Sequence, residues 1–105
     1  MSIPDAGAAV FSNVTVSGIA GNAPSTLKAT VDVKHSWSGD VVLDLVAPDG
    51  STYRLKNSSN TSTPNVNTTY TVNASSEVAN GTWRLKAQDV YAQDTGYIDS
   101  WKLTF

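Results

Sequence analysis

The residues best suited to chemistry are one histidine and a few aspartates that stand beside turns. His35 is the only histidine among the 105 residues, and the chain has no cysteine. A hydrolase of the Ser-His-Asp kind would need His35 as its general base. His35 shares an alternating face with Val31 and Val33, however, and no Gly-x-Ser-x-Gly turn is present to expose a serine. We therefore expect a structural histidine and no catalytic residue.

Three aspartates stand at or near the ends of predicted strands. Asp40 opens one strand, Asp89 closes another, and Asp94 follows five residues later in a loop. Calcium is a hard cation that takes several oxygen ligands, and loops add backbone carbonyl groups to the carboxylates. We therefore predict a calcium site at one rim of the fold, formed by these three carboxylates, with Asp5 as a reserve ligand.

Two other interpretations of the aspartates remain open. Turn aspartates often hydrogen-bond their own backbone and then need no metal. Paired carboxylates also hydrolyse glycosides, but no aromatic platform for a sugar adjoins them in the sequence. Asp32 and Asp44 lie on predicted outward strand faces, and we expect them to take no part in a metal site.

Composition excludes several classes of partner. The net charge is −2, the isoelectric point is about 5.0, and the seven Lys and Arg residues are scattered, so no positive field attracts nucleic acid. No apolar run approaches the ~20 residues that span a bilayer. Residues 1–7 lack the basic head and apolar core of a signal peptide. We expect one soluble domain, residues 1–105, excised from a larger protein.

The elements that must position these residues are short strands. Residues 27–37 alternate apolar and polar side chains, which predicts a half-buried strand with His35 and Trp37 on its inward face. Residues 41–47 form a second strand, which the turn at 48–51 joins to a third. In that third strand the expected inward side chains are Tyr53 and Leu55, and the outward ones are Arg54 and Lys56.

The second half of the chain continues this pattern. Residues 57–67 are polar and are expected to form a mobile loop. Strand signals resume at 68–73, at 82–87 and at 97–105, while no segment repeats apolar residues at helical spacing. Frequent turns between short strands predict an all-β fold, an antiparallel β-sandwich of about seven to nine strands.

The order of these residues resembles the P domain, also called the Homo B domain, of proprotein convertases such as kexin and furin and of many bacterial secreted proteases. The entry sequence Ile3-Pro4-Asp5 is similar to that of bacterial members, so the resemblance covers essentially the whole chain. The matching positions are His35, Gly39, Asp40, Pro48 and Gly50, then Gly81, Trp83, Leu85, Asp89, Asp94, Gly96, Trp101 and Leu103.

The resemblance implies a jelly-roll β-sandwich that follows a subtilisin-like, or sometimes another, catalytic domain and has no catalytic residue of its own. It implies an accessory domain that acts in cis by stabilising the catalytic domain, assisting its folding or adjusting its calcium, pH or substrate behaviour. The parent is then expected to be a secreted serine-type protease, and the domain a monomer. Some animal members have Arg-Gly-Asp where this chain has Ser38-Gly39-Asp40, so an integrin partner has no support.

An independent substrate-binding module for collagen, another protein or carbohydrate is the alternative function. Such a module needs exposed aromatic side chains. The inward aromatic residues are expected to be Tyr53, Tyr70, Trp83, Trp101 and Phe105, which leaves Trp37, Tyr91 and Tyr97 near loops. A free-standing hydrolase is the least favoured of the three functions.

Overall fold

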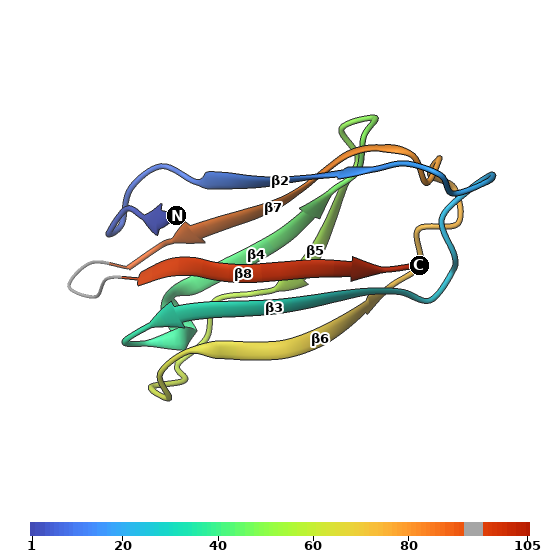
Figure 1. Cartoon of the computed structure of the whole chain (residues 1–105). Helices are drawn as coiled ribbons and strands as arrows, with labels where there is room; N and C mark the ends of the chain where they lie inside the picture. The colour runs from blue at the N-terminus through green and yellow to red at the C-terminus, as the bar shows by residue number, and fades with distance from the viewer. Residues whose placement is uncertain (92–95) are drawn as a thin grey trace.

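Two antiparallel sheets pack face to face in the computed structural model, which describes residues 1–91 and 96–105 (Figure 1). The expected all-β sandwich is confirmed, with eight strands and one short 3-10 turn in the described residues. No helix long and apolar enough to span a membrane occurs there. The elements are β1 (Ser2–Ile3), β2 (Val10–Val16), β3 (Leu27–His35), η1 (Ser38–Asp40), β4 (Val41–Val46), β5 (Thr52–Lys56), β6 (Val66–Val72), β7 (Gly81–Asp89) and β8 (Gly96–Thr104).

The strands are ordered β1-β8-β3-β6 in one sheet and β2-β7-β4-β5 in the other. Most consecutive strands therefore lie in different sheets, and the chain crosses repeatedly between the two layers (Figure 1). β1 pairs only with the first two residues of β8, through Ser2 with Tyr97 and Ile3 with Gly96. The rest of β8 keeps one edge that pairs with no described strand, and β2 does the same in the other sheet.

The core lies between the sheets because apolar residues alternate along the central strands. Val31 and Val33 of β3 pack with Leu43 of β4 and Leu85 of β7, and all four are fully buried. Each such side chain contributes roughly 1.5–3 kcal/mol when it leaves water. This alternation is what the sequence predicted.

Two tryptophans face inward, as expected, but to different extents. Trp83 is fully buried, and its Nε1–H donates to the carbonyl oxygen of Ala79 at 2.9 Å. Trp101 is half-buried at the side of the sandwich, where its Nε1–H donates to Oγ of Ser12 at 3.0 Å. Phe105 contacts Trp83 edge-on at 6.0 Å between ring centres, yet 37% of Phe105 remains exposed.

The prediction for the end of the first long strand was wrong for Trp37. β3 ends at His35, and Trp37 lies beyond the ladder with 41% of its surface exposed. The reason is local, since the backbone N–H of Trp37 donates to Nδ1 of His35 at 3.0 Å and the chain then enters η1.

Two side chains predicted to be exposed lie largely out of the solvent. Lys56 is half-buried because its long stem carries the ammonium group to the carbonyl oxygens of Ser38 and Val41, at 2.7 and 2.8 Å. Asp44 is only 4% exposed because Arg54 covers it, with Nε donating to Oδ1 at 2.6 Å. Lys56 and Asp44 were both predicted to be exposed, and in both cases the length of a basic side chain explains why the prediction was wrong.

The polar segment after β5 is shorter than predicted, since β6 already begins at Val66, which is buried against the core. The remaining loop, residues 57–65, forms four backbone hydrogen bonds with residues 35–39. A side chain at Gly39 would collide with the backbone of Ser59 and Thr61, so the loop packs here only against a glycine.

Candidate functional site

Three buried titratable residues meet at one end of the sandwich. They are His35, Asp40 and Asp89, and one potential ligand atom from each lies within 4.8 Å of the others. The topology explains the cluster, because β3 and β7 end at this point and η1 leads into β4 beside them. Val41, the first residue of β4, is paired with Asp89 in the ladder. Sequence analysis correctly predicted that Asp40 and Asp89 share this rim.

Both ring nitrogens of His35 have hydrogen-bond partners. Nδ1 accepts from the backbone N–H of Trp37, so the proton belongs on Nε2, which donates to Oδ2 of Asp89 at 2.9 Å. The side chains of His35 and Asp89 are both fully buried. Oδ1 of Asp89 accepts the backbone N–H of Tyr91 at 3.1 Å. The geometry defines a neutral imidazole held against a buried carboxylate.

Two neighbours complete the surroundings of this pair. Gly96 lies opposite His35 in the ladder, and a side chain there would collide with the imidazole. Lys56 brings a positive charge to the same end, where burial lowers its pKa and the nearby carboxylate of Asp40 opposes that shift. The ammonium group of Lys56 thereby satisfies carbonyl groups at both ends of η1.

This cluster includes two of the three residues predicted to bind calcium. Asp40 and Asp89 offer oxygen ligands of the kind that calcium prefers. Asp94, the third, lies outside the described residues. Asp5 is exposed and is not part of the cluster, and Asp32 instead pairs with Lys34 at 2.8 Å.

His35 was expected to be structural, and its hydrogen bonds agree with that role. In this arrangement it would have to give up a bond to Trp37 or Asp89 before it could coordinate an ion. Sequence reasoning missed the direct pairing of His35 with Asp89. The available signal was that His35 lies near the end of one predicted strand and that Asp89 closes another.

The same end carries the three aromatic residues that the sequence placed near loops. Trp37, Tyr91 and Tyr97 are 41%, 56% and 45% exposed. Beside Tyr97 a shallow groove of about 570 Å³ runs past Lys34 and Asn65. An end of this kind can contact a protein or a polymer surface through its aromatic side chains.

The fold and this end define a recognised class of domain. The model of the proprotein convertase P-domain family matches residues 24–105, and the chain belongs to this family. The resemblance drawn from the sequence is therefore confirmed.

Curated relatives extend the match to the whole chain. It is 58% identical to leupeptin-inactivating enzyme 1 of Streptomyces exfoliatus and 57% identical to the transglutaminase-activating metalloprotease of Streptomyces mobaraensis, over 100% of its length in both cases. It is 31% identical, over 91% of its length, to the extracellular basic protease of Dichelobacter nodosus. The chain spans only 24%, 14% and 16% of these three proteins.

A solved structure supports the fold independently. The serine protease of Aeromonas sobria superimposes on 97% of this chain with a TM-score of 0.79 at 20% identity, and the match covers 24% of that protease. One curated relative is named as a metalloprotease, whereas the solved structure with the same fold is named as a serine protease.

Proposed function

We propose that this chain is a non-catalytic accessory domain of a secreted protease, which stabilises the catalytic domain of the same polypeptide. The observation that carries the proposal is the P-domain match, together with relatives four or more times as long as this chain, two of which are named as proteases. The buried histidine supports the non-catalytic assignment, because its nitrogens are both engaged and no serine is bonded to them in the described part of the chain.

Two measurements test this proposal. The isolated chain should hydrolyse neither peptide nor ester substrates, and turnover that disappears in a His35→Ala variant would refute the assignment. Deleting residues 1–105 from the parent protease should leave an enzyme that loses its activity faster during a heat step. Equal loss of activity with and without the domain would refute the stabilising role.

The expected serine-type parent is a narrower proposal. The Aeromonas sobria fold match favours it, whereas one relative at 57% identity is a metalloprotease. A covalent serine reagent should inactivate the parent and a chelator should not, if the serine assignment holds. The opposite result would assign a metal-dependent catalytic domain and leave the accessory role intact. We further propose export from the cell and a monomeric isolated domain.

Substrate binding is a second candidate function, favoured by the exposure of Trp37, Tyr91 and Tyr97 at one end. If this end binds collagen or a polysaccharide, the isolated chain should sediment with the insoluble polymer. Replacing Trp37 and Tyr97 with Ala should then weaken binding at least tenfold. Phe11→Ala is the matched control, since Phe11 is 43% exposed on a different element. Failure of the chain to sediment would exclude this function for the polymers tested.

Calcium binding at the rim is a third proposal. Asp40 and Asp89 would supply carboxylate ligands, with Asp94 as the predicted third. Two buried carboxylates that approach one another repel, and a divalent cation would remove that repulsion. A ligand that binds only the folded state adds about 2.7 kcal/mol at 100 times its dissociation constant.

A further inference from the structure

The strand β2 is an edge strand without the usual protection. One side of β2 pairs with β7 in continuous register, and no described strand pairs with the other side. Its sequence, VFSNVTV, has no charge and no proline, and residues 6–27 as a whole contain no Asp, Glu, Lys or Arg. Edge strands in soluble proteins are usually protected by charges, prolines, bulges or a covering segment. β2 has none of the first three.

A second free edge lies on the same side of the molecule. Met1 bonds the backbone of Ile98, and beyond Ile98 the outer edge of β8 has no partner in the described residues. Trp101 of β8 reaches Ser12 of β2 across the gap between the sheets. We call the two free edges and the apolar row between them the open side. This row is half-buried, apart from the more exposed Phe105, and consists of Val10, Val14, Val16, Trp101, Leu103 and Phe105.

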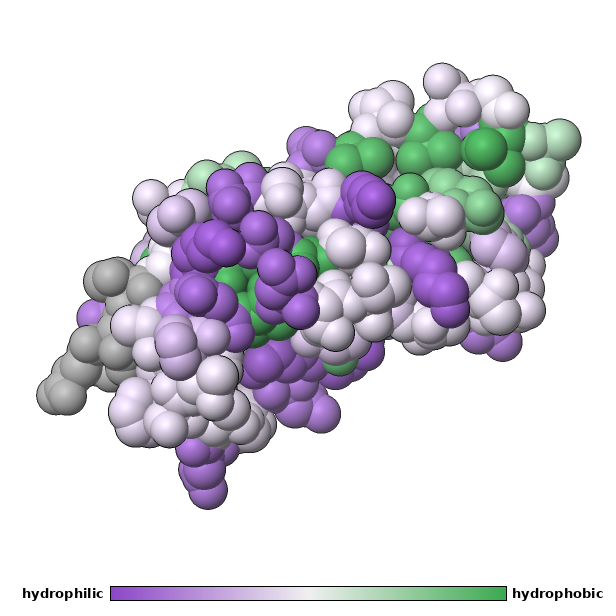
Figure 2. Space-filling model, turned by 60° about the horizontal axis from the view of Figure 1, so that its bottom comes forward, coloured by the Kyte–Doolittle hydropathy of each residue, from purple (hydrophilic) through white to green (hydrophobic). Residues whose placement is uncertain are grey.

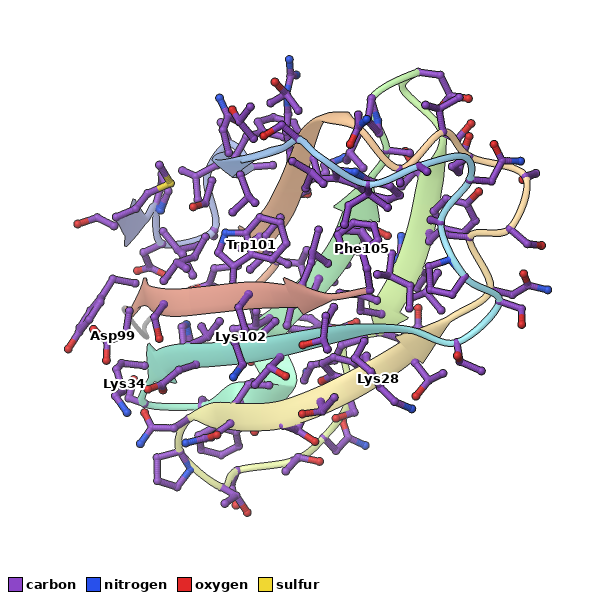
Figure 3. All side chains as sticks on the ribbon, turned by 45° about the vertical axis from the view of Figure 1, so that its right-hand side comes forward. Lys28, Lys34, Asp99, Trp101, Lys102 and Phe105 are labelled. Carbon is purple, nitrogen blue, oxygen red and sulfur yellow. The ribbon has the colours of Figure 1, made fainter. Side chains whose placement is uncertain are left out.

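The surface around the open side differs from the rest of the molecule. Figure 3 shows Trp101 and Phe105 projecting from β8 toward β2, while Lys28 and Lys102 belong to the opposite, solvent-facing side of that sheet. Figure 2 brings the bottom of Figure 1 forward, away from β2, and on that face hydrophobic residues are gathered toward the end of the molecule that carries the C-terminus. Contiguous apolar surface on a soluble domain marks an interaction site more often than an ordinary surface.

We propose that the open side is the docking surface for the catalytic domain of the parent protease, with an uncharged extended segment of that domain adding to the free edge of β2. This inference rests on the proposed accessory function. Three quarters or more of the length of each relative lies outside this domain, so each relative contains a large region that is available to contact the domain intramolecularly. Strand addition would supply the missing hydrogen bonds of the edge.

The position of the N-terminus also supports the catalytic domain as the partner that covers the open side. The amino group of Met1 donates to the carbonyl oxygen of Ile98, and the N–H of Ile98 donates to the carbonyl oxygen of Met1. Met1 therefore lies against the edge of β8, at the head of the open side. A domain joined upstream of Met1 would be tethered next to this surface, which raises its effective concentration there.

Charge distinguishes β2 from one of the other two outer strands, and burial distinguishes it from the second. On the opposite edge of the β2 sheet, β5 carries Arg54 and Lys56, and such charges deter strand addition. The edge strand β6 is uncharged like β2, but its Val66 and Val72 are buried, whereas the valines of β2 are only half-buried. A neutral partner that covers apolar side chains as well as the strand edge is expected to choose β2.

Hydrogen exchange of the backbone amides tests the proposal. The isolated chain and the complete parent protease are compared segment by segment. The amides of residues 10–16 that point away from β7, every second one along the strand, should exchange at least tenfold more slowly in the parent, while those of residues 66–72 in the other edge strand should be unchanged. Equal exchange of residues 10–16 in both proteins would overturn the proposal. So would a concentration-dependent dimer of the isolated chain that gives the same protection, because a second copy would then be the occupant.

A pair of matched variants separates this surface from the accessory function itself. Asn13→Lys places a charge on an exposed position of β2, and Asn67→Lys places the same charge on an exposed position of the edge strand β6. Both isolated variants should melt like the unmodified chain. In the parent protease only Asn13→Lys should remove the protection of residues 10–16 and shorten the lifetime of activity.

The two proposals fail in different ways. If deletion of the domain shortens the lifetime of activity but Asn13→Lys does not, the docking surface is wrong and the accessory function stands. If deletion has no effect on the lifetime while residues 10–16 are protected in the parent, the docking surface stands and the stabilising function is wrong.

Discussion

Asp89→Ala is expected to be among the most destabilising substitutions in the chain. The change removes the acceptor of a buried donor, Nε2–H of His35, and of a part-buried donor, the backbone N–H of Tyr91. Each donor left without a partner costs about 1–3 kcal/mol, so the two together cost about 2–6 kcal/mol. We therefore expect a loss of about 2–6 kcal/mol from the roughly 5–15 kcal/mol that stabilises a domain of this size.

Urea unfolding followed by tryptophan fluorescence measures this loss, because Trp83 is buried in the folded state. The unfolding is carried out in chelator, so that the cost arises from hydrogen bonds alone. A loss of about 4 kcal/mol should lower the melting temperature by roughly 15–30 °C for a domain of about 100 residues. Asp99→Ala is the control, since Asp99 is exposed on β8 and should cost no more than about 0.5 kcal/mol.

A double variant checks the physical reason. Replacing His35 and Asp89 together by leucine removes donor and acceptor at once, so its cost should be well below the sum of the two single replacements. Strict additivity, or a loss below about 1 kcal/mol for Asp89→Ala, would refute the account of a tightly paired buried site.

Three further outcomes are expected. Trp83→Ala should cost about 3–5 kcal/mol, whereas Trp101→Ala should cost less because Trp101 is only half-buried, and the midpoints of urea unfolding check this difference. The hydroxyl of Tyr53 donates to Glu77 at 2.7 Å, and this bond raises the pKa of Tyr53. Its stabilisation is complete below the unfolded-state pKa of about 10 and is lost as the pH rises through the higher folded-state pKa, so Tyr53→Phe should show a smaller loss of stability across that range. Excess calcium should raise the melting temperature above that in chelator, and Asp40→Asn should reduce the difference; equal melting of the unmodified chain in both solutions would show that no calcium site exists.

The sequence was informative wherever a strand pattern alone decides the position of a residue. Alternation predicted the inward faces of β3 and β7, including Trp83, and the positions of strand ends brought Asp40 and Asp89 to one rim. Contacts made by long or polar side chains were harder to predict from the sequence, because they depend on the register of the strands and on the length of the side chain. The burial of Asp44 under Arg54 is such a contact.

The absence of protecting charges on the edge strand β2 likewise could not be inferred before the order of the strands was known. Residues 6–27 lack charge, but this becomes a feature of an edge strand only because β2 pairs on one side alone. The same holds for His35 and Asp89, which are 54 residues apart and meet because β3 of one sheet and β7 of the other end at the same end of the sandwich.

The lifetime of catalytic activity in the parent protease tests the central claim most directly. Asp89→Ala is introduced into the complete polypeptide, and activity is followed at a fixed temperature between the melting points of the unmodified and substituted domain. We predict that the freshly folded variant has the same kcat/KM as the unmodified protease but loses activity at least tenfold faster, approaching the rate of the protease that lacks residues 1–105. An unchanged rate of inactivation would show that the catalytic domain does not depend on this domain, and would contradict the account.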